Sequence, residues 1–199
     1  GPEAPTTNRI EQYIAFVQKA DKRQLLIDLI EGQMVACGIV FTRTKHGANR
    51  LAKQLSKVGI PSDSIHGDKS QTARTRALNA FRNGDVFILV ATDIASRGID
   101  VEDITHVFNF DLPNEPEVYI HRIGRTARAG RDGLAYSFCD ETESGYLVGI
   151  QRLLGEEIEV LEDQPYHFEK ARPKPGQKPG RVKGAPVGGR SRRGTGRGG

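Results

Sequence analysis

Four apolar runs, rich in β-branched and aromatic residues, place the strongest constraint on how this 199-residue chain folds. They span residues 36–42, 86–91, 104–110 and 133–139. Continuously apolar strands of this kind are typical of a parallel sheet that is buried on both faces. A shorter strand is expected near Ser64 and Ile65, just after Pro61.

Segments of helical period separate these strands. Within residues 48–58 and 70–84, apolar side chains recur at a spacing that puts them on one helical face, and Gly84 is expected to end the second helix. The residues of these faces are Leu51, Leu55 and Val58, then Ala73, Ala77, Leu78 and Phe81. The alternation predicts a doubly wound α/β domain, with a mostly parallel sheet and helices on both faces.

The charge is unevenly distributed along the chain. Residues 170–199 contain ten Lys or Arg and no Asp or Glu, which leaves residues 1–169 with 19 basic and 25 acidic side chains. We therefore expect a folded domain over residues 9–165 and a disordered basic tail, rich in Gly, Arg and Pro, over 166–199. Such a tail favours contact with RNA phosphates, although a solubilising role is the alternative.

The remaining composition narrows the class of protein. Gly1-Pro2 has the form of a protease cleavage remnant, so residues 1–8 are interpreted as that remnant and an interdomain linker, and the natural chain is expected to continue upstream. Cys37 and Cys139 lie in apolar runs without metal-ligand spacing, which predicts reduced, buried thiols, no metal site and a cytoplasmic protein. No apolar stretch approaches the length of a membrane span, and the first residues do not have the pattern of a signal peptide, so neither is expected in this sequence.

Polar residues follow each predicted strand, where an open α/β sheet binds its ligands. They are Arg43-Thr44 after the first apolar run, His66-Gly67 after Ile65, Thr92-Asp93 and 96–100 after the second run, and Asp111 after the third. The dipeptide Gly-Lys of a phosphate loop occurs nowhere. Asp140, after the last run, is therefore interpreted as a helix N-cap in a capping box, not as a magnesium ligand.

Arginines recur at every third residue in YIHRIGRTARAG, residues 119–130. The preceding segment is compatible with a helix, and Asn114 is a candidate cap for it. Arg125 and Arg128 fall near the junction of helix and loop, where two guanidinium groups suit a phosphoryl group in transfer. By spacing alone, a solvated or salt-bridged basic face explains the repeat as well.

The order FTRT, IHGDKSQTAR, VATDIASRGID and YIHRIGRTARAG closely resembles motifs IV, IVa, V and VI in the second RecA-like domain of DEAD-box RNA helicases. The resemblance covers residues 10–160, and two segments, FTRTKHGANRLA and SQTARTRALNAF, look most like the bacterial RhlE-type subgroup. In motif VI it implies that Arg125 and Arg128 are arginine fingers for the γ-phosphate of ATP. His121 and Arg122 match residues of the closed interface between the two domains.

In motif V, the resemblance implies that Asp100 contacts the ATP ribose and that Gly98 lies near the phosphates. Arg97 matches an interdomain ion-pair arginine, and Thr92 matches a hydroxyl on the RNA backbone.

Motifs IV and IVa are implied to face RNA. Arg43 and Thr44 represent motif IV, while Arg74 and the backbone amide of Gly67 represent motif IVa. Ala127 departs from the family pattern, which usually has glycine there, and this puts only the local loop geometry in doubt.

The resemblance implies that the chain is the second half of an ATP-dependent RNA helicase, inactive as an ATPase by itself. ATP and Mg²⁺ would be held mainly by a first RecA-like domain that carries the phosphate loop. Contacts aimed at phosphates predict RNA recognition that is largely independent of sequence. Two alternatives stay open: a stand-alone RNA-binding or partner-docking module, and a DNA translocase domain of the same superfamily.

Overall fold

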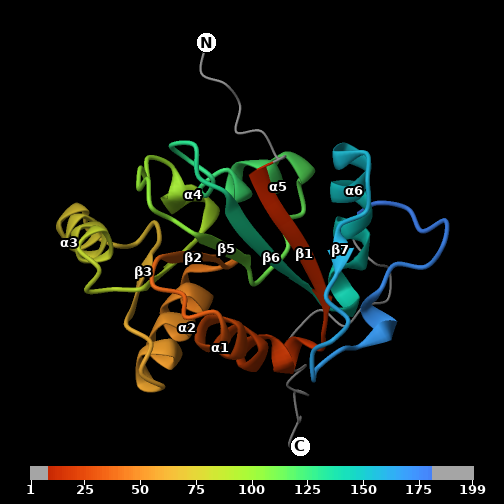
Figure 1. Ribbon diagram of the computed structural model, residues 1–199, viewed down its shortest axis with the longest axis horizontal. Helices are drawn as coiled ribbons and strands as arrows, with labels where there is room; N and C mark the ends of the chain where they lie inside the picture. The colour runs from red at the N-terminus through yellow and green to blue at the C-terminus, as the bar shows by residue number, and fades with distance from the viewer. Residues whose placement is uncertain (1–8, 181–199) are drawn as a thin grey trace, which may run out of the picture.

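The computed structural model describes residues 9–180, which form a seven-stranded sheet in the order β3-β4-β2-β5-β6-β1-β7 (Figure 1). Each neighbouring pair of strands is parallel. The strands are β1 Ile10–Phe16, β2 Gly38–Phe41, β3 Ser62–Ile65, β4 Ile88–Ala91, β5 His106–Asn109, β6 Gly133–Cys139 and β7 Glu159–Val160. The predicted parallel α/β architecture is confirmed.

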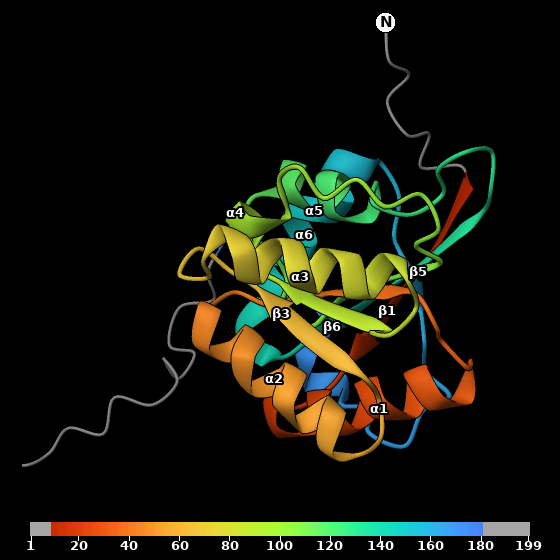
Figure 2. The ribbon, with the colours of Figure 1, turned by 90° about the vertical axis from the view of Figure 1, so that its left-hand side faces the viewer.

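Helices cover both faces of this sheet (Figure 2). The α-helices are α1 Lys22–Gly32, α2 Lys45–Lys57, α3 Gln71–Arg82, α4 Asp93–Ser96, α5 Pro116–Ile123 and α6 Ser144–Leu154. Three short 3₁₀ helices, η2 Lys19–Asp21, η3 Glu141–Glu143 and η4 Glu169–Ala171, complete the regular structure of the described range.

Two hydrophobic cores lie on opposite sides of the sheet, because successive strand residues point to opposite faces. Val40 of β2 packs with α1 and α2, through residues such as Leu26 and Leu55. Its neighbour Phe41 faces the other core, which contains Phe81 of α3 and Tyr119 of α5. This burial on both faces explains why the sequences of these strands are continuously apolar.

The helical patterns are confirmed with small corrections at their ends. Val58 was expected on the buried face of its helix, but it is the C-cap residue of α2 and is 50% exposed. The N-cap of the helix of the arginine repeat lies one residue later than Asn114, the predicted cap. This N-cap is Glu115, and Pro116 occupies the first turn, where a missing N–H has no cost.

Residues 166–180 differ from the expected disordered tail, since they pack against the domain. The amide of Phe168 donates to the carbonyl oxygen of Phe16 at 2.8 Å, and Ala171 is fully buried. Gln177 donates to Ser144 Oγ at 2.9 Å, and the amide of Gly180 donates to Gly145 O at 3.1 Å. Aromatic and small residues supply contacts that the basic composition conceals. The rest of the expected tail, like residues 1–8, lies outside the described residues.

Candidate functional site

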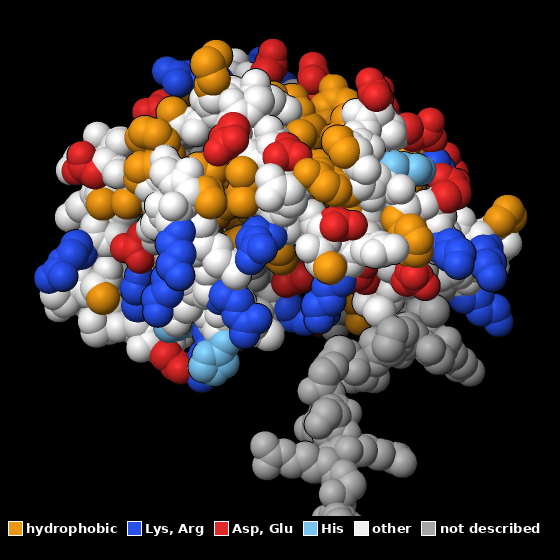
Figure 3. All heavy atoms as spheres, turned by 90° about the horizontal axis from the view of Figure 1, so that it is seen from below, with side chains coloured by type: hydrophobic (Ala, Val, Ile, Leu, Met, Phe, Trp, Pro, Cys, Tyr) orange, Lys and Arg blue, Asp and Glu red, His pale blue; other side chains and the backbone are white. Residues whose placement is uncertain are grey.

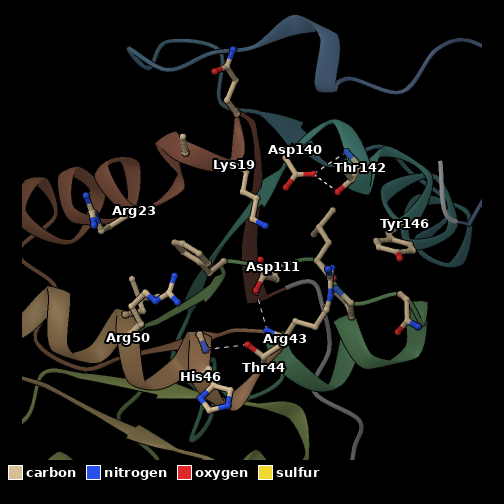
Figure 4. Close-up of a pocket in the computed structure, with 18 of the residues that line it drawn as sticks. Lys19, Arg23, Arg43, Thr44, His46, Arg50, Asp111, Asp140, Thr142 and Tyr146 are labelled. Carbon is tan, nitrogen blue, oxygen red and sulfur yellow. Dashed lines mark hydrogen bonds between the residues drawn. The ribbon is translucent and has the colours of Figure 1, made fainter. Parts of the chain in front are cut away.

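The carboxyl ends of β1, β2, β5 and β6 open onto a cleft with a volume of about 1330 Å³ (Figure 4). Its walls include Arg43 after β2, Asp111 after β5 and Asp140 after β6. The amide of Arg43 donates to Asp111 Oδ2 at 2.9 Å, so residues far apart in sequence meet at this edge. Sequence reasoning placed the site at the same edge of the sheet.

Lys22 forms a buried ion cluster beneath the cleft. Its side chain is 1% exposed, and Nζ lies 2.6 Å from Glu143 Oε1, 3.3 Å from Asp111 Oδ1 and 3.4 Å from Asp140 Oδ2. Burial alone would lower the pKa of Lys22, but these three carboxylates raise it above its usual value. Lys22 therefore stays charged and joins the start of α1 to the ends of β5 and β6.

The three carboxylates respond differently to this lysine. Burial raises the pKa of Glu143 above its usual value despite the contact with Lys22. Burial also works against ionisation of Asp111 and Asp140, but Lys22 and their hydrogen bonds outweigh it and lower both pKa values. Asp140 forms the predicted capping box: it accepts from the amide of Thr142 at 2.9 Å, and Glu143 accepts from its amide at 3.2 Å.

Arg43 and Thr44, the predicted RNA-facing pair of motif IV, also have contacts inside the domain. Arg43 Nη2 donates to Leu112 O at 3.1 Å and lies 3.3 Å from Glu143 Oε2, yet 52% of the side chain is exposed. Thr44 caps α2 by accepting from the amide of Gly47 at 3.0 Å. Both residues line the cleft, so an incoming ligand can reach them.

Arg122 was expected at an interdomain interface, but the structure places its guanidinium inside this domain. Nε and Nη2 bind the carboxylate of Asp93 at 2.6 and 2.8 Å, and Nη1 donates to Asp111 O at 2.6 Å. The side chain is only 3% exposed and lies over the ring of Phe41. Such a bidentate pair fixes α5 against α4. His121, the preceding residue, is exposed.

Arg125 and Arg128 lie beside the loop that contains Gly98 and Asp100. Arg128 Nη1 is 2.8 Å from Asp100 Oδ1, and Arg125 Nη1 donates to Ile99 O at 3.2 Å. Burial first, and then the positive charge of Arg128, lower the pKa of Arg125. Asp100 only partly offsets the repulsion between Arg125 and Arg128, so an additional anion would be favourable here.

The loop that carries these arginines is strained. Ala127 and Ala129 have φ values of 58° and 57°, followed by Gly130 at 77°. This left-handed region disfavours side chains, which explains physically why glycine suits position 127. The alanine costs local strain, and the loop still brings Arg128 to Asp100.

Arg74 joins motif IVa to motif V. Its Nη1 donates to Ala95 O at 2.6 Å, and its Nη2 donates to Arg97 O at 2.8 Å. Thr92 is the N-cap residue of α4, and Gly67 is exposed with open space around its Cα. Gly67 and Thr92 therefore follow the ends of β3 and β4, next to the end of β2, while Arg74 reaches the segment after β4 from α3.

Two residues of this edge escaped the sequence reasoning: Lys22 as the centre of the buried cluster, and Asp93 as the partner of Arg122. Acidic residues after two neighbouring strand ends, at Asp111 and Asp140, were the signal that a buried cation was needed. Within residues 9–180, no group of three or more His, Cys, Asp or Glu side chains has an arrangement that could hold a metal ion. No helix of that range is long and apolar enough to cross a membrane.

Comparisons with known proteins agree with this geometry. Residues 21–130 match the family described as helicase conserved C-terminal domain. The DEAD-box ATP-dependent RNA helicase CshA of Geobacillus kaustophilus is 44% identical over 156 residues, which are 78% of this chain and 33% of that protein. The chain thus spans about a third of the length of this curated relative.

Two solved structures show the same fold. The Escherichia coli DEAD-box protein SrmB, bound to regulator of ribonuclease activity A, is 36% identical with a TM-score of 0.72 over 85% of this chain and 96% of that chain. Saccharomyces cerevisiae Dbp5, bound to RNA and ADP BeF3, is 35% identical with a TM-score of 0.69 over 76% of this chain and 41% of that one. The RhlE-type assignment stays a prediction.

Proposed function

Because the chain belongs to the helicase conserved C-terminal domain family, as the second RecA-like domain of a DEAD-box protein, we propose that it completes an ATP-dependent RNA helicase. One observation carries this proposal: Arg125 and Arg128 sit beside the motif V loop, where Asp100 pairs with Arg128 and only partly offsets the two positive charges. A domain without a phosphate loop of its own has a use for such a pair when another domain supplies the nucleotide.

The residues at this loop fit the outer side of a nucleotide. Gly98 has a φ of 79°, is exposed, and has no heavy atom within 4 Å of the position that a Cβ would take, so a ligand can approach its backbone. We assign Asp100 to the ribose, and Arg125 and Arg128 to the γ-phosphate. ATP supplies the phosphoryl group and Mg²⁺ neutralises it, and both would be held mainly by the first domain.

Two further side chains are assigned to the contact with that first domain. Arg97, just before Gly98, and His121, on α5 ahead of the arginine pair, are exposed and therefore available to a second domain. Arg122 acts indirectly in this proposal: its bidentate bond to Asp93 holds α5, and therefore Arg125, in place. Closure of the two domains would bring the arginine pair onto the phosphate and exclude water.

RNA is the proposed polymer substrate, bound through its backbone. The donors are guanidinium, hydroxyl and amide groups: Arg43, Thr44, Gly67 and Thr92 follow neighbouring strand ends, and Arg74 lies on α3. Donors of this kind bind phosphates without reading base edges, so we expect little sequence preference. Arg74 already donates to two carbonyl oxygens of the motif V segment. RNA bound at Arg74 would therefore be linked directly to the nucleotide loop.

The similarity to DEAD-box proteins favours this function over a stand-alone RNA-binding module or a DNA translocase domain. The cytoplasmic location and the RNA contacts of the basic tail stay predictions, as do unwinding or remodelling of a particular RNA.

Hydrolysis by the two-domain protein tests the arginine fingers. With the first domain restored in the same chain, Arg128→Ala is expected to lower RNA-stimulated ATP hydrolysis on the order of 10³-fold, because a positioned arginine stabilises charge in the transition state. RNA binding should change little. The matched control is Arg131→Ala, since Arg131 is 68% exposed and pairs only with Asp103 on the surface.

An unchanged hydrolysis rate in Arg128→Ala would contradict the finger role. RNA-stimulated hydrolysis by residues 1–199 alone would contradict the dependence on a first domain. Both rates are measured as phosphate release with and without RNA.

A further inference from the structure

A group of cations on the α1 and α2 side of the cleft has no role in the motifs described above. Lys19, Arg23 and Arg50 line the cleft and are exposed. Within residues 9–180, none of the three has an acidic partner or a side-chain hydrogen bond. In Figure 4, Lys19 and Arg50 reach toward the middle of the cleft from η2, which directly precedes α1, and from α2.

The acidic residues of the same cleft are mostly neutralised already. Asp111 and Asp140 bind Lys22, and Asp93 binds Arg122. Glu141 is the acidic lining residue without a basic partner among the described residues. Three cations thus face one free carboxylate, and the charge available to a ligand is positive. Figure 3, which views the side of α1 and α2, shows Lys and Arg side chains in a band across this face.

The cleft also contains aromatic side chains. Phe110 and Tyr146 line it, and both rings are only partly buried. A positively charged groove with aromatic rings is the usual arrangement for single-stranded nucleic acid, because phosphates follow the cations while bases stack on the rings. Carboxylates of an acidic peptide would use the cations alone, whereas a nucleic acid uses the cations for its phosphates and the rings for its bases, so these residues favour a nucleic acid.

The cleft is continuous with the edge assigned to RNA. Arg43 and Thr44, which follow β2, belong to both. A strand bound at the motifs would therefore continue toward Lys19 and Arg23.

The packed segment 166–180 ends beside the same cleft. Gly180 binds the backbone of Gly145, and Gly145 directly precedes Tyr146 in the cleft wall. The chain beyond Gly180 contains six further Lys or Arg and no acidic residue.

We propose that this cleft is a second RNA site, in which Lys19, Arg23 and Arg50 bind the phosphates of a single strand that continues past the motif residues. The proposal rests on the proposed function, since it takes RNA as the substrate. It adds a length requirement: an RNA that covers only the residues of motifs IV, IVa and V would not reach Lys19, Arg23 and Arg50.

A charge-neutral triple variant of the 199-residue chain tests this site. Lys19→Gln, Arg23→Gln and Arg50→Gln are combined, and the control combines Lys53→Gln, Lys57→Gln and Arg152→Gln, three exposed cations outside the cleft. Binding of fluorescent oligouridylates of about 6 and about 20 nucleotides is measured by polarisation, over a series of salt concentrations. Thermal unfolding shows that each variant is folded.

The cleft variant is expected to bind the long RNA at least tenfold more weakly at low salt. The slope of log K against log salt should fall by about 2, since each lost phosphate contact on a single strand accounts for roughly 0.7. Binding of the short RNA should stay within about twofold, and the control variant should resemble the unchanged chain with both RNAs. Should the triple variant not fold, Arg50→Gln alone is expected to lower the slope by about 0.7.

Equal losses in the cleft and control variants would overturn the proposal, because bulk charge would then explain them. So would a glutamate-rich peptide that binds the cleft as tightly as the long RNA. Arg74→Ala separates this proposal from the proposed function itself. If Arg74→Ala bound both RNAs more weakly and the cleft variant had no effect, the proposed RNA function would stand and the cleft proposal would be overturned. If neither the unchanged chain nor the two-domain protein bound RNA, both the proposed RNA function and the cleft proposal would be overturned.

Discussion

The Lys22 cluster and the Arg125–Arg128 pair use the same kinds of charge in opposite ways. Lys22 is 1% exposed and has three carboxylates within 3.4 Å. Arg128 is 35% exposed, and its partner Asp100 is 78% exposed. The first site is complete without a ligand, whereas the second has more positive than negative charge and stays open to solvent.

The backbone is regular around the Lys22 cluster and strained around the Arg125–Arg128 pair. The cluster lies at the ends of regular strands and at a satisfied capping box. The arginine pair depends on a loop with two alanines at positive φ. A loop of this kind keeps its conformation because the surrounding structure imposes it, which is a common feature of binding sites. We infer that the cluster mainly stabilises the domain, and that the loop serves binding.

Lys22→Met gives the largest expected effect on stability. The substitution keeps the volume of the side chain but leaves Asp111, Asp140 and Glu143 without their buried cation. Breaking a buried ion pair from one side costs about 3–5 kcal/mol of unfolding free energy. Urea unfolding of the 199-residue chain measures this loss.

Arg128→Gln is the matched control from the open pair. A largely exposed ion pair contributes at most about 1 kcal/mol, so this variant should unfold close to the unchanged chain. Similar losses in Lys22→Met and Arg128→Gln would contradict the distinction between the two regions.

The sequence predicted the buried strands and the sheet edge of the site better than the individual contacts within the two regions. Strands β2, β4, β5 and β6 were recognisable because their residues are apolar on both faces, as burial between two helical layers requires. Strand β1 was missed, since Glu11 and Gln12 interrupt its apolar pattern. It pairs with β6, more than 100 residues away, and nothing local in the sequence marks such a contact.

The site shows the same limit. The sheet edge and the capping role of Asp140 followed from residues next to strand ends. Lys22 lies in the polar segment KADKRQ, where Lys19 and Arg23 have equal charge and similar surroundings in sequence. Only the fold distinguishes the lysine that is buried. Likewise, three equally spaced arginines separate into one buried residue, Arg122, and two open ones, because Arg122 alone faces Asp93.

The dependence of stability on acid pH is a smaller effect that also distinguishes the Lys22 cluster from the arginine pair. The pKa values of Asp111 and Asp140 are lowered in the folded state, so the unfolded chain takes up protons first as pH falls. Their contribution is present above the unfolded pKa of about 3.9 and is lost as pH falls below it. The raised pKa of Glu143 opposes this trend in part.

The stability difference between the unchanged chain and Lys22→Met should therefore narrow as pH falls from about 6 to 3, because the depressed pKa values depend on Lys22. The unfolding free energy of Arg128→Gln should instead change with pH in parallel to that of the unchanged chain. Urea midpoints at several pH values measure both differences. A constant gap for Lys22→Met would show that this lysine stabilises the fold by packing and not through the two carboxylates.

Ala129→Gly tests the strain in the arginine loop and has the smallest expected effect. Ala129 is exposed and has a φ of 57°, so glycine removes the strain of a side chain without removing a buried methyl group. We expect stabilisation of up to about 1 kcal/mol, reduced by the greater freedom of glycine in the unfolded chain. Ala80→Gly, within α3, should instead destabilise by about 1 kcal/mol, because helical backbone favours alanine. Urea unfolding of both variants gives the two signs. Equal destabilisation by both would mean that the loop conformation stores no strain, and the contrast with the cluster would then reduce to burial alone.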